Sequence, residues 1–159
     1  MATFAISPDE DAVLVEIHIA APPERVFAAI TDPRQMLQWW GQNGMYRCTQ
    51  FHTDVRAGGS WRSAGLNDNG QPFHVEGEYL EVDPPRLLVH TWVASWTGDL
   101  KTTVHWELEP SSNGTLVRLR HSGFAARPGA VREHAQGWQV VLGWMQAFVE
   151  NGATVDTRG

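Results

Sequence analysis

The side chains best suited to chemistry are His121 and Tyr79. In the stretch TLVRLRHS the apolar residues Val117 and Leu119 alternate with arginines, so His121 shares their face. Tyr79 ends the alternating stretch FHVEGEY and shares the face of its apolar residues. A neutral imidazole with a pKa near ~6.5 can transfer a proton at physiological pH, and a phenol can orient a ligand. Both are candidate catalytic groups or ligand anchors, although a hydrogen bond inside the core would use either of them equally well.

Two further histidines lie where packing decides their role. In LLVHTW one phase turns His90 and Trp92 toward the inner face, and we prefer this aromatic set over its alternate neighbours. His134 stands near Gly137, which thins a long predicted helix beside Trp138. The gap at that glycine is either the mouth of a cavity or a place of close packing.

No other chemical motif is strong. The seven histidines include no His-Glu-x-x-His pair, and HTD at residues 52–54 is a weak metal pattern. The single cysteine, Cys48, excludes a paired-cysteine site and an internal disulfide. The sequence contains neither the G-x-S-x-G of a nucleophile elbow nor the G-x-G-x-x-G of a dinucleotide site. We therefore predict no bound metal and no cofactor.

Length, composition and net charge restrict the class of protein. The chain has 159 residues, eight tryptophans and a net charge of −6 at pH 7. This length predicts one domain over residues 1–159, with its core at about residues 13–151. An acidic surface is unsuited to nucleic acid, and the N-terminal stretch has neither a basic flank nor a long apolar run. We expect a cytoplasmic protein without a membrane span.

Hydrophobic periodicity gives the elements that would position these side chains. Residues 13–20 alternate as a half-buried strand, and prolines open two short helices at Pro23 and Pro33. Apolar residues at spacings of three and four predict one long helix between Pro128 and Asn151. Short turns separate six further strands, which must be antiparallel because the loops cannot hold crossover helices. These strands are YRCTQFHTD, SWRSAG, FHVEGEYLEV, LLVHTWVAS, TTVHWELE and TLVRLRHSG.

One long helix across the concave face of a single sheet leaves a gap for side chains or a ligand. Trp39 and Trp40 end a short helix at the rim, where we expect one ring in the cavity and the other over the rim. A purely structural role for this pair stays open. Gly77 shares the inner face of Tyr79, so Gly77→Phe is expected to exclude a dye from the cavity. The predicted cavity residues are Trp39, Trp40, Trp61, Phe73, Tyr79, Trp92, Trp106, Leu119, His121, Trp138, Leu142 and Met145.

Five ordered motifs resemble one protein family. They are VFAAITDPRQMLQWWG, DVRAGGSWR, GEYLEVDPPRLLVHTW, GTLVRLRHSGF and EHAQGWQVVLGWMQAFVENG. The chain resembles the stand-alone bacterial proteins related to the activator of the heat-shock-protein ATPase, within the SRPBCC superfamily of START and birch-pollen-allergen-like proteins. The resemblance implies an α+β helix-grip fold. Its seven-stranded antiparallel sheet wraps round a long C-terminal helix, with two short helices between the first two strands.

Three function classes remain. We favour a carrier or sensor that binds an apolar or aromatic small molecule in the cavity, and a homodimer stays open. A cyclase or dehydratase would use the same cavity, with His121 or Tyr79 as acid or base. A chaperone regulator would instead bind protein through its outer surface. The resemblance disfavours that class, because the co-chaperones carry an additional N-terminal domain without a counterpart in this sequence.

Overall fold

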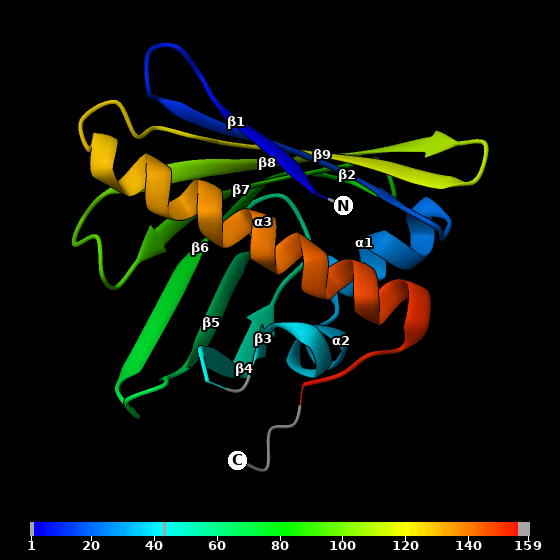
Figure 1. The fold of residues 1–159 in the computed structure, drawn as a ribbon, viewed down its shortest axis with the longest axis horizontal. Coiled ribbons are helices and arrows are strands. Elements are labelled where there is room, and N and C mark those ends of the chain that lie inside the picture. The colour runs from blue at the N-terminus through cyan, green and yellow to red at the C-terminus, as the bar shows by residue number, and fades with distance from the viewer. Residues whose placement is uncertain (1, 43, 156–159) are drawn as a thin grey trace.

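The protein folds as a single curved antiparallel sheet with a long helix across its concave face (Figure 1). The computed structural model describes residues 2–42 and 44–155. The helices are α1 Pro23–Thr31, α2 Pro33–Trp39 and α3 Pro128–Asn151. The strands are β1 Thr3–Ile6, β2 Ala12–Ile19, β3 Gly41–Gln42, β4 Tyr46–Thr53, β5 Ser60–Asn67, β6 Pro72–Asp83, β7 Leu87–Ala94, β8 Lys101–Ser111 and β9 Gly114–Ser122.

The strand order places the N-terminal strands beside the last strand of the sheet. The sheet runs β1-β2-β9-β8-β7-β6-β5-β4-β3, and every neighbouring pair is antiparallel. From β3 to β9 the strands follow one another as a meander, and β2 then pairs with β9. The antiparallel sheet and the long C-terminal helix predicted from the sequence are therefore confirmed.

The predicted number of seven strands is wrong, because the described residues form nine. The two additional strands are β1, which pairs with β2, and the two-residue β3, which pairs with β4. Neither gives a sequence signal: β1 has only four residues and is largely exposed, and two residues carry no period. The short helices consequently lie between the second and third strands.

Local chemistry sets the ends of the helices. Pro23 and Pro33 occupy the first turns of α1 and α2, where their fixed φ suits a helix and no N–H is needed. Asp32 caps α2, since its side chain accepts a hydrogen bond from Arg34 N at 2.9 Å. Gly152 ends α3 with a left-handed φ of 71°.

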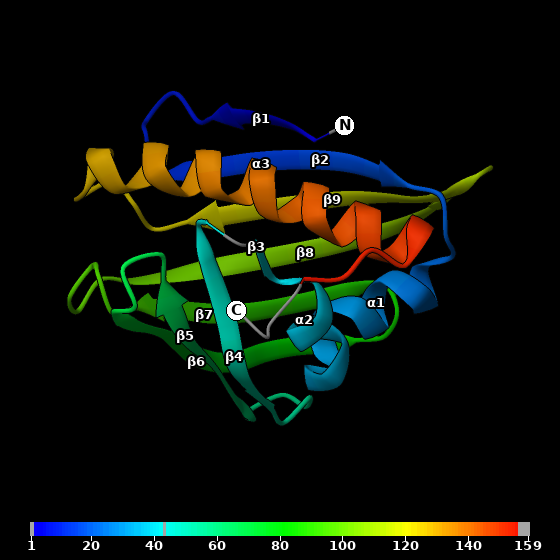
Figure 2. The same cartoon turned by 60° about the horizontal axis from the view of Figure 1, so that its bottom comes forward.

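The position of α3 is asymmetric. It packs mainly against β2 and β1 at one side of the sheet, and α1 and α2 lie beside its C-terminal part (Figure 2). Strands β4 to β7 curve away on the other side, so the N-terminal half of α3 does not cover them fully. This asymmetry divides the concave face into a packed half and an open half.

Asp32→Ala should lower the free energy of unfolding by about 1 kcal/mol, because the first turn of α2 loses its side-chain acceptor. Arg34→Ala is the control: this arginine also lies 3.7 Å from the Asp32 carboxylate, but its side chain is 90% exposed. An exposed ion pair contributes only roughly 0–1 kcal/mol. Urea unfolding of both variants measures the difference, and equal losses would contradict the capping role.

Candidate functional site

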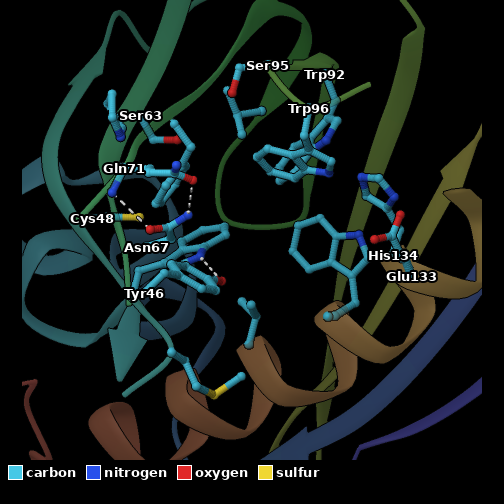
Figure 3. A pocket seen from close by; sticks show the side chains of 18 residues that line it. Tyr46, Cys48, Ser63, Asn67, Gln71, Trp92, Ser95, Trp96, Glu133 and His134 are labelled. Carbon is cyan, nitrogen blue, oxygen red and sulfur yellow. Dashed lines mark hydrogen bonds between the residues drawn. The ribbon is translucent and has the colours of Figure 1, made fainter. Parts of the chain in front are cut away.

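A pocket of about 670 Å³ occupies the open half of the concave face (Figure 3). Its walls come from β4 to β7, from the loops beside them and from the N-terminal half of α3. Six tryptophan, tyrosine and phenylalanine side chains in these walls make the pocket predominantly apolar. The lining residues are Trp40, Met45, Tyr46, Cys48, Ser63, Asn67, Gln71, Pro72, Phe73, Val75, Trp92, Ser95, Trp96, Glu133, His134, Gly137, Trp138 and Val141.

One face of α3 forms a wall of the pocket. His134, Gly137, Trp138 and Val141 occupy positions i, i+3, i+4 and i+7, so they project from the same side of the helix. A Cβ atom added at Gly137 would meet nothing within 4 Å. Gly137 therefore leaves the space open, and the gap anticipated at this glycine is part of a pocket rather than close packing.

The adjacent tryptophans at the end of α2 divide between core and pocket. Trp39 is 1% exposed and donates from Nε1 to Ala29 O at 2.9 Å, so it is a core residue. Trp40 lines the pocket and donates from Nε1 to Tyr46 Oη at 3.2 Å. The two rings stack, with centroids 4.9 Å apart, because Trp40 has left the helix and adopts an extended conformation. Of the pair expected to place one ring in the cavity and the other over the rim, Trp40 lines the pocket and Trp39 lies in the core.

The twelve predicted cavity residues separate in the same way. Four line the pocket: Trp40, Phe73, Trp92 and Trp138. The other eight do not line it and are each at most 8% exposed, so they are core residues. These eight are Trp39, Trp61, Tyr79, Trp106, Leu119, His121, Leu142 and Met145.

Both ring nitrogens of His121 make their hydrogen bonds inside the core. Its Nδ1 accepts a hydrogen bond from Trp138 Nε1 at 2.9 Å, so its Nε2 carries the proton and donates to Thr102 Oγ1 at 2.6 Å. Thr102 Oγ1 in turn donates to Trp92 O at 3.2 Å. Burial lowers the pKa of His121 well below its usual 6.5. The imidazole is therefore neutral, and neither ring nitrogen remains for a ligand.

His90 repeats this arrangement. Its Nε2 accepts from Trp106 Nε1 at 3.1 Å, and its Nδ1 donates to Thr91 O at 3.1 Å. Burial lowers the pKa of His90 to about 4, so this ring is also neutral. Both phases of β7 are buried, but the contacts agree with the chosen one, since Trp92 packs against Trp138 of α3 and lines the pocket.

The other reactive side chains are held in their neutral forms. Tyr79 lies outside the pocket, and burial raises the pKa of its phenol. Cys48 does line the pocket, but burial raises the pKa of its thiol to about 12. A protonated thiol is a poor nucleophile. Among the described residues, no group of three or more His, Cys, Asp or Glu side chains is placed to hold a metal ion.

Gly77 is not a pocket residue, which changes the expectation for Gly77→Phe. A Cβ atom at this position would lie 2.1 Å from Thr91 O and 2.6 Å from Trp61 Nε1. Any larger residue would therefore disturb the pairing of β6 with β7 rather than fill a cavity. Gly137 is the glycine at which a side chain can enter the pocket without a clash.

Several lining residues were missed in the sequence. In β4 the pairing with β5 is irregular between Cys48 and Gln50. This irregularity breaks the alternation, so the sequence pattern does not identify the inward residues of the strand. Trp96 lies in the loop after β7, where period-two arguments do not apply. His134 was noticed beside Gly137 but was not assigned to the cavity, although its spacing to Trp138 was a usable signal.

Comparisons place this geometry among known proteins. A family model described as Activator of Hsp90 ATPase homolog 1-like protein matches residues 20–150. No curated protein matches the sequence. Within the part of the chain that the structure describes, no helix is long and apolar enough to cross a membrane.

Solved structures share the fold over most of the chain. A Rhodobacter sphaeroides protein is 20% identical, with 94% of this chain and 98% of that chain covered and a TM-score of 0.81. A Chromobacterium violaceum protein is 28% identical, with coverages of 88% and 98% and a TM-score of 0.75. DynU16, a protein from the dynemicin biosynthetic locus, is 27% identical over 90% of this chain, with a TM-score of 0.70. The present chain spans 48% of DynU16.

The buried histidines predict a loss of stability in acid. The unfolded chain binds a proton at the usual His pKa of 6.5, whereas folded His90 resists it down to about pH 4. In that window the free energy of unfolding should fall as pH falls, by about 1.4 kcal/mol per pH unit for this residue. His90→Gln, which keeps an acceptor for Trp106, should reduce the slope by that amount.

Urea unfolding at several pH values between 6.5 and 4 measures this slope. The matched control is His52→Gln, because the His52 side chain is exposed in the folded protein. An identical slope in wild type and His90→Gln would contradict the buried, neutral state of His90.

Proposed function

The chain belongs to the family of Activator of Hsp90 ATPase homolog 1-like proteins, and on that premise we propose that it binds an apolar or aromatic small molecule in the pocket beside α3. The family and the fold support ligand binding in general. DynU16 comes from a biosynthetic locus, which agrees with a small-molecule ligand. The chaperone-regulator hypothesis rests on the description of the family alone.

The observation that carries the proposal is the open, aromatic pocket itself. Its volume of about 670 Å³ lies within the usual range for ligand sites, roughly 300–1,000 Å³. Trp92 and Trp138 pack with ring centroids 5.2 Å apart, and Phe73 and Trp96 meet edge to face at 6.1 Å. Flat apolar molecules can stack on such rings.

A carrier or sensor fits the described lining better than an enzyme that uses the predicted acid and base. His121 has both ring nitrogens bonded in the core, and Tyr79 lies outside the pocket. The lining thiol of Cys48 is held protonated by burial, which raises its pKa to about 12. A cyclase or dehydratase would have to use His134, the lining imidazole, in place of His121 and Tyr79.

Gly137→Leu should weaken binding of the neutral dye Nile red at least about tenfold, because a Cβ atom has open space at this lining position and the rest of the leucine side chain would occupy pocket volume. Helix propensity favours leucine over glycine by roughly 0.5–1 kcal/mol, so the variant should fold at least as stably as wild type. Dye fluorescence gives the affinity, and thermal unfolding gives the stability.

Gly143→Leu is the matched control. Gly143 also lies in α3 with open space around its Cβ position, but it does not line the pocket. This variant should gain the same helix stability and bind Nile red as wild type does. Equal dye affinity in the two variants would overturn the proposal.

A further inference from the structure

Two tryptophan–histidine pairs on the concave face are joined by a hydrogen bond, and a third pair, Trp92 with His134, is in ring contact without one. Trp106 donates to His90, and Trp138 donates to His121, each through the indole Nε1. In the third pair the rings of Trp92 and His134 are T-shaped, with centroids 6.1 Å apart. Neither Trp92 Nε1 nor His134 Nε2 has a hydrogen-bond partner among residues 2–42 and 44–155.

Trp92 and His134 are called the open pair, because each has a ring nitrogen without a partner. Both residues of this pair line the pocket. Trp92 and His134 are 8% and 7% exposed, and both belong to the pocket wall. Buried polar groups in folded proteins nearly always have a partner, so two such nitrogens in one wall require an explanation. A polar group of a bound molecule can satisfy both.

The chemistry and contacts of the two rings decide which free nitrogen donates a hydrogen bond and which accepts one. An indole Nε1 can only donate. His134 Nδ1 lies 2.8 Å from Ala130 O, so Nδ1 carries the proton and donates to this carbonyl. Burial lowers the pKa of His134, which keeps the ring neutral. His134 Nε2 is then an acceptor, and the pair offers one donor and one acceptor.

We infer that Trp92 Nε1 and His134 Nε2 bind the neutral hydroxyl group of an aromatic ligand in this pocket, an inference that rests on the proposed binding function. A hydroxyl oxygen accepts from Trp92 and donates to His134 at the same time. A carboxylate lacks the proton that His134 requires. The described lining residues also include no lysine or arginine to balance an anion, and Glu133 would repel one.

The ring of Trp96 lies beside the pair. It is nearly parallel to the ring of His134, with an interplanar angle of 20° and centroids 6.2 Å apart. It is also 52% exposed, in the loop that follows β7. Trp92 Nε1 and His134 Nε2 are shielded from solvent, so a neighbouring side chain must move before a hydroxyl group reaches them. The exposed ring of Trp96 is the neighbour that the inference assigns to this movement. Figure 3 shows Trp96 beside Trp92 and His134 on one side of the pocket.

The test compares two molecules of nearly the same shape, 4-phenylphenol and 4-methylbiphenyl, which both compete with Nile red. In a purely apolar pocket the methyl compound binds more tightly, because a hydroxyl group loses its hydration. The open pair predicts the reverse order. Each hydrogen bond should favour 4-phenylphenol by about three- to tenfold.

His134→Phe should abolish the preference for 4-phenylphenol and leave 4-methylbiphenyl bound. Trp92→Phe also keeps an aromatic ring and should reduce the same preference. It provides the test if His134→Phe fails to fold. His105→Phe is the control, because His105 lies on β8 away from the pocket lining and should keep the wild-type preference.

The outcomes separate this inference from the function on which it rests. If Nile red binds but wild type prefers 4-methylbiphenyl or neither compound displaces the dye, the hydroxyl site is wrong and the binding function stands. A preference for 4-phenylphenol that survives in both His134→Phe and Trp92→Phe also overturns the site. If neither the dye nor the biphenyls bind, both proposals fail.

Discussion

The hydrogen bond from Trp138 to His121 holds the long helix against the sheet, and the remaining architecture depends on it. It joins the middle of α3 to β9 at 2.9 Å, and His121 passes the chain of hydrogen bonds on to Thr102 of β8. The Trp138 ring also packs on Trp106 and Trp92, with centroids 5.5 and 5.2 Å away. Buried polar networks of this kind specify one arrangement of a core, because each member must be satisfied.

The position of α3 determines which part of the concave face is a packed core and which part is a pocket. The helix contacts β2 and β1 on one side, so the residues between α3 and β8–β9 form a closed core. On the other side Gly137 contributes no side chain, and β4 to β7 remain partly uncovered. The pocket is thus a consequence of helix placement, and Trp138 belongs to both its wall and the core.

The sequence was sufficient for the family and for the antiparallel sheet with its long C-terminal helix, but not for the number of strands, and only in part for the site. Alternation in β2, β8 and β9 and the spacing in α3 correctly identified the inward residues, and the resemblance based on five motifs is confirmed by the family match. Alternation cannot tell an inward residue under the helix from one beside it. That distinction depends on sheet curvature and on contacts such as Trp138–His121 between distant segments, so His121 was placed inward correctly but given the wrong surroundings.

A crystal structure of the protein with 4-phenylphenol tests the account most directly, because it locates a ligand without assuming any role for it. The account predicts density for both rings between Trp92, Trp138 and Phe73, with the oxygen within hydrogen-bonding distance of His134 Nε2. Density for the compound elsewhere on the protein, or a pocket closed by its own side chains, would contradict it.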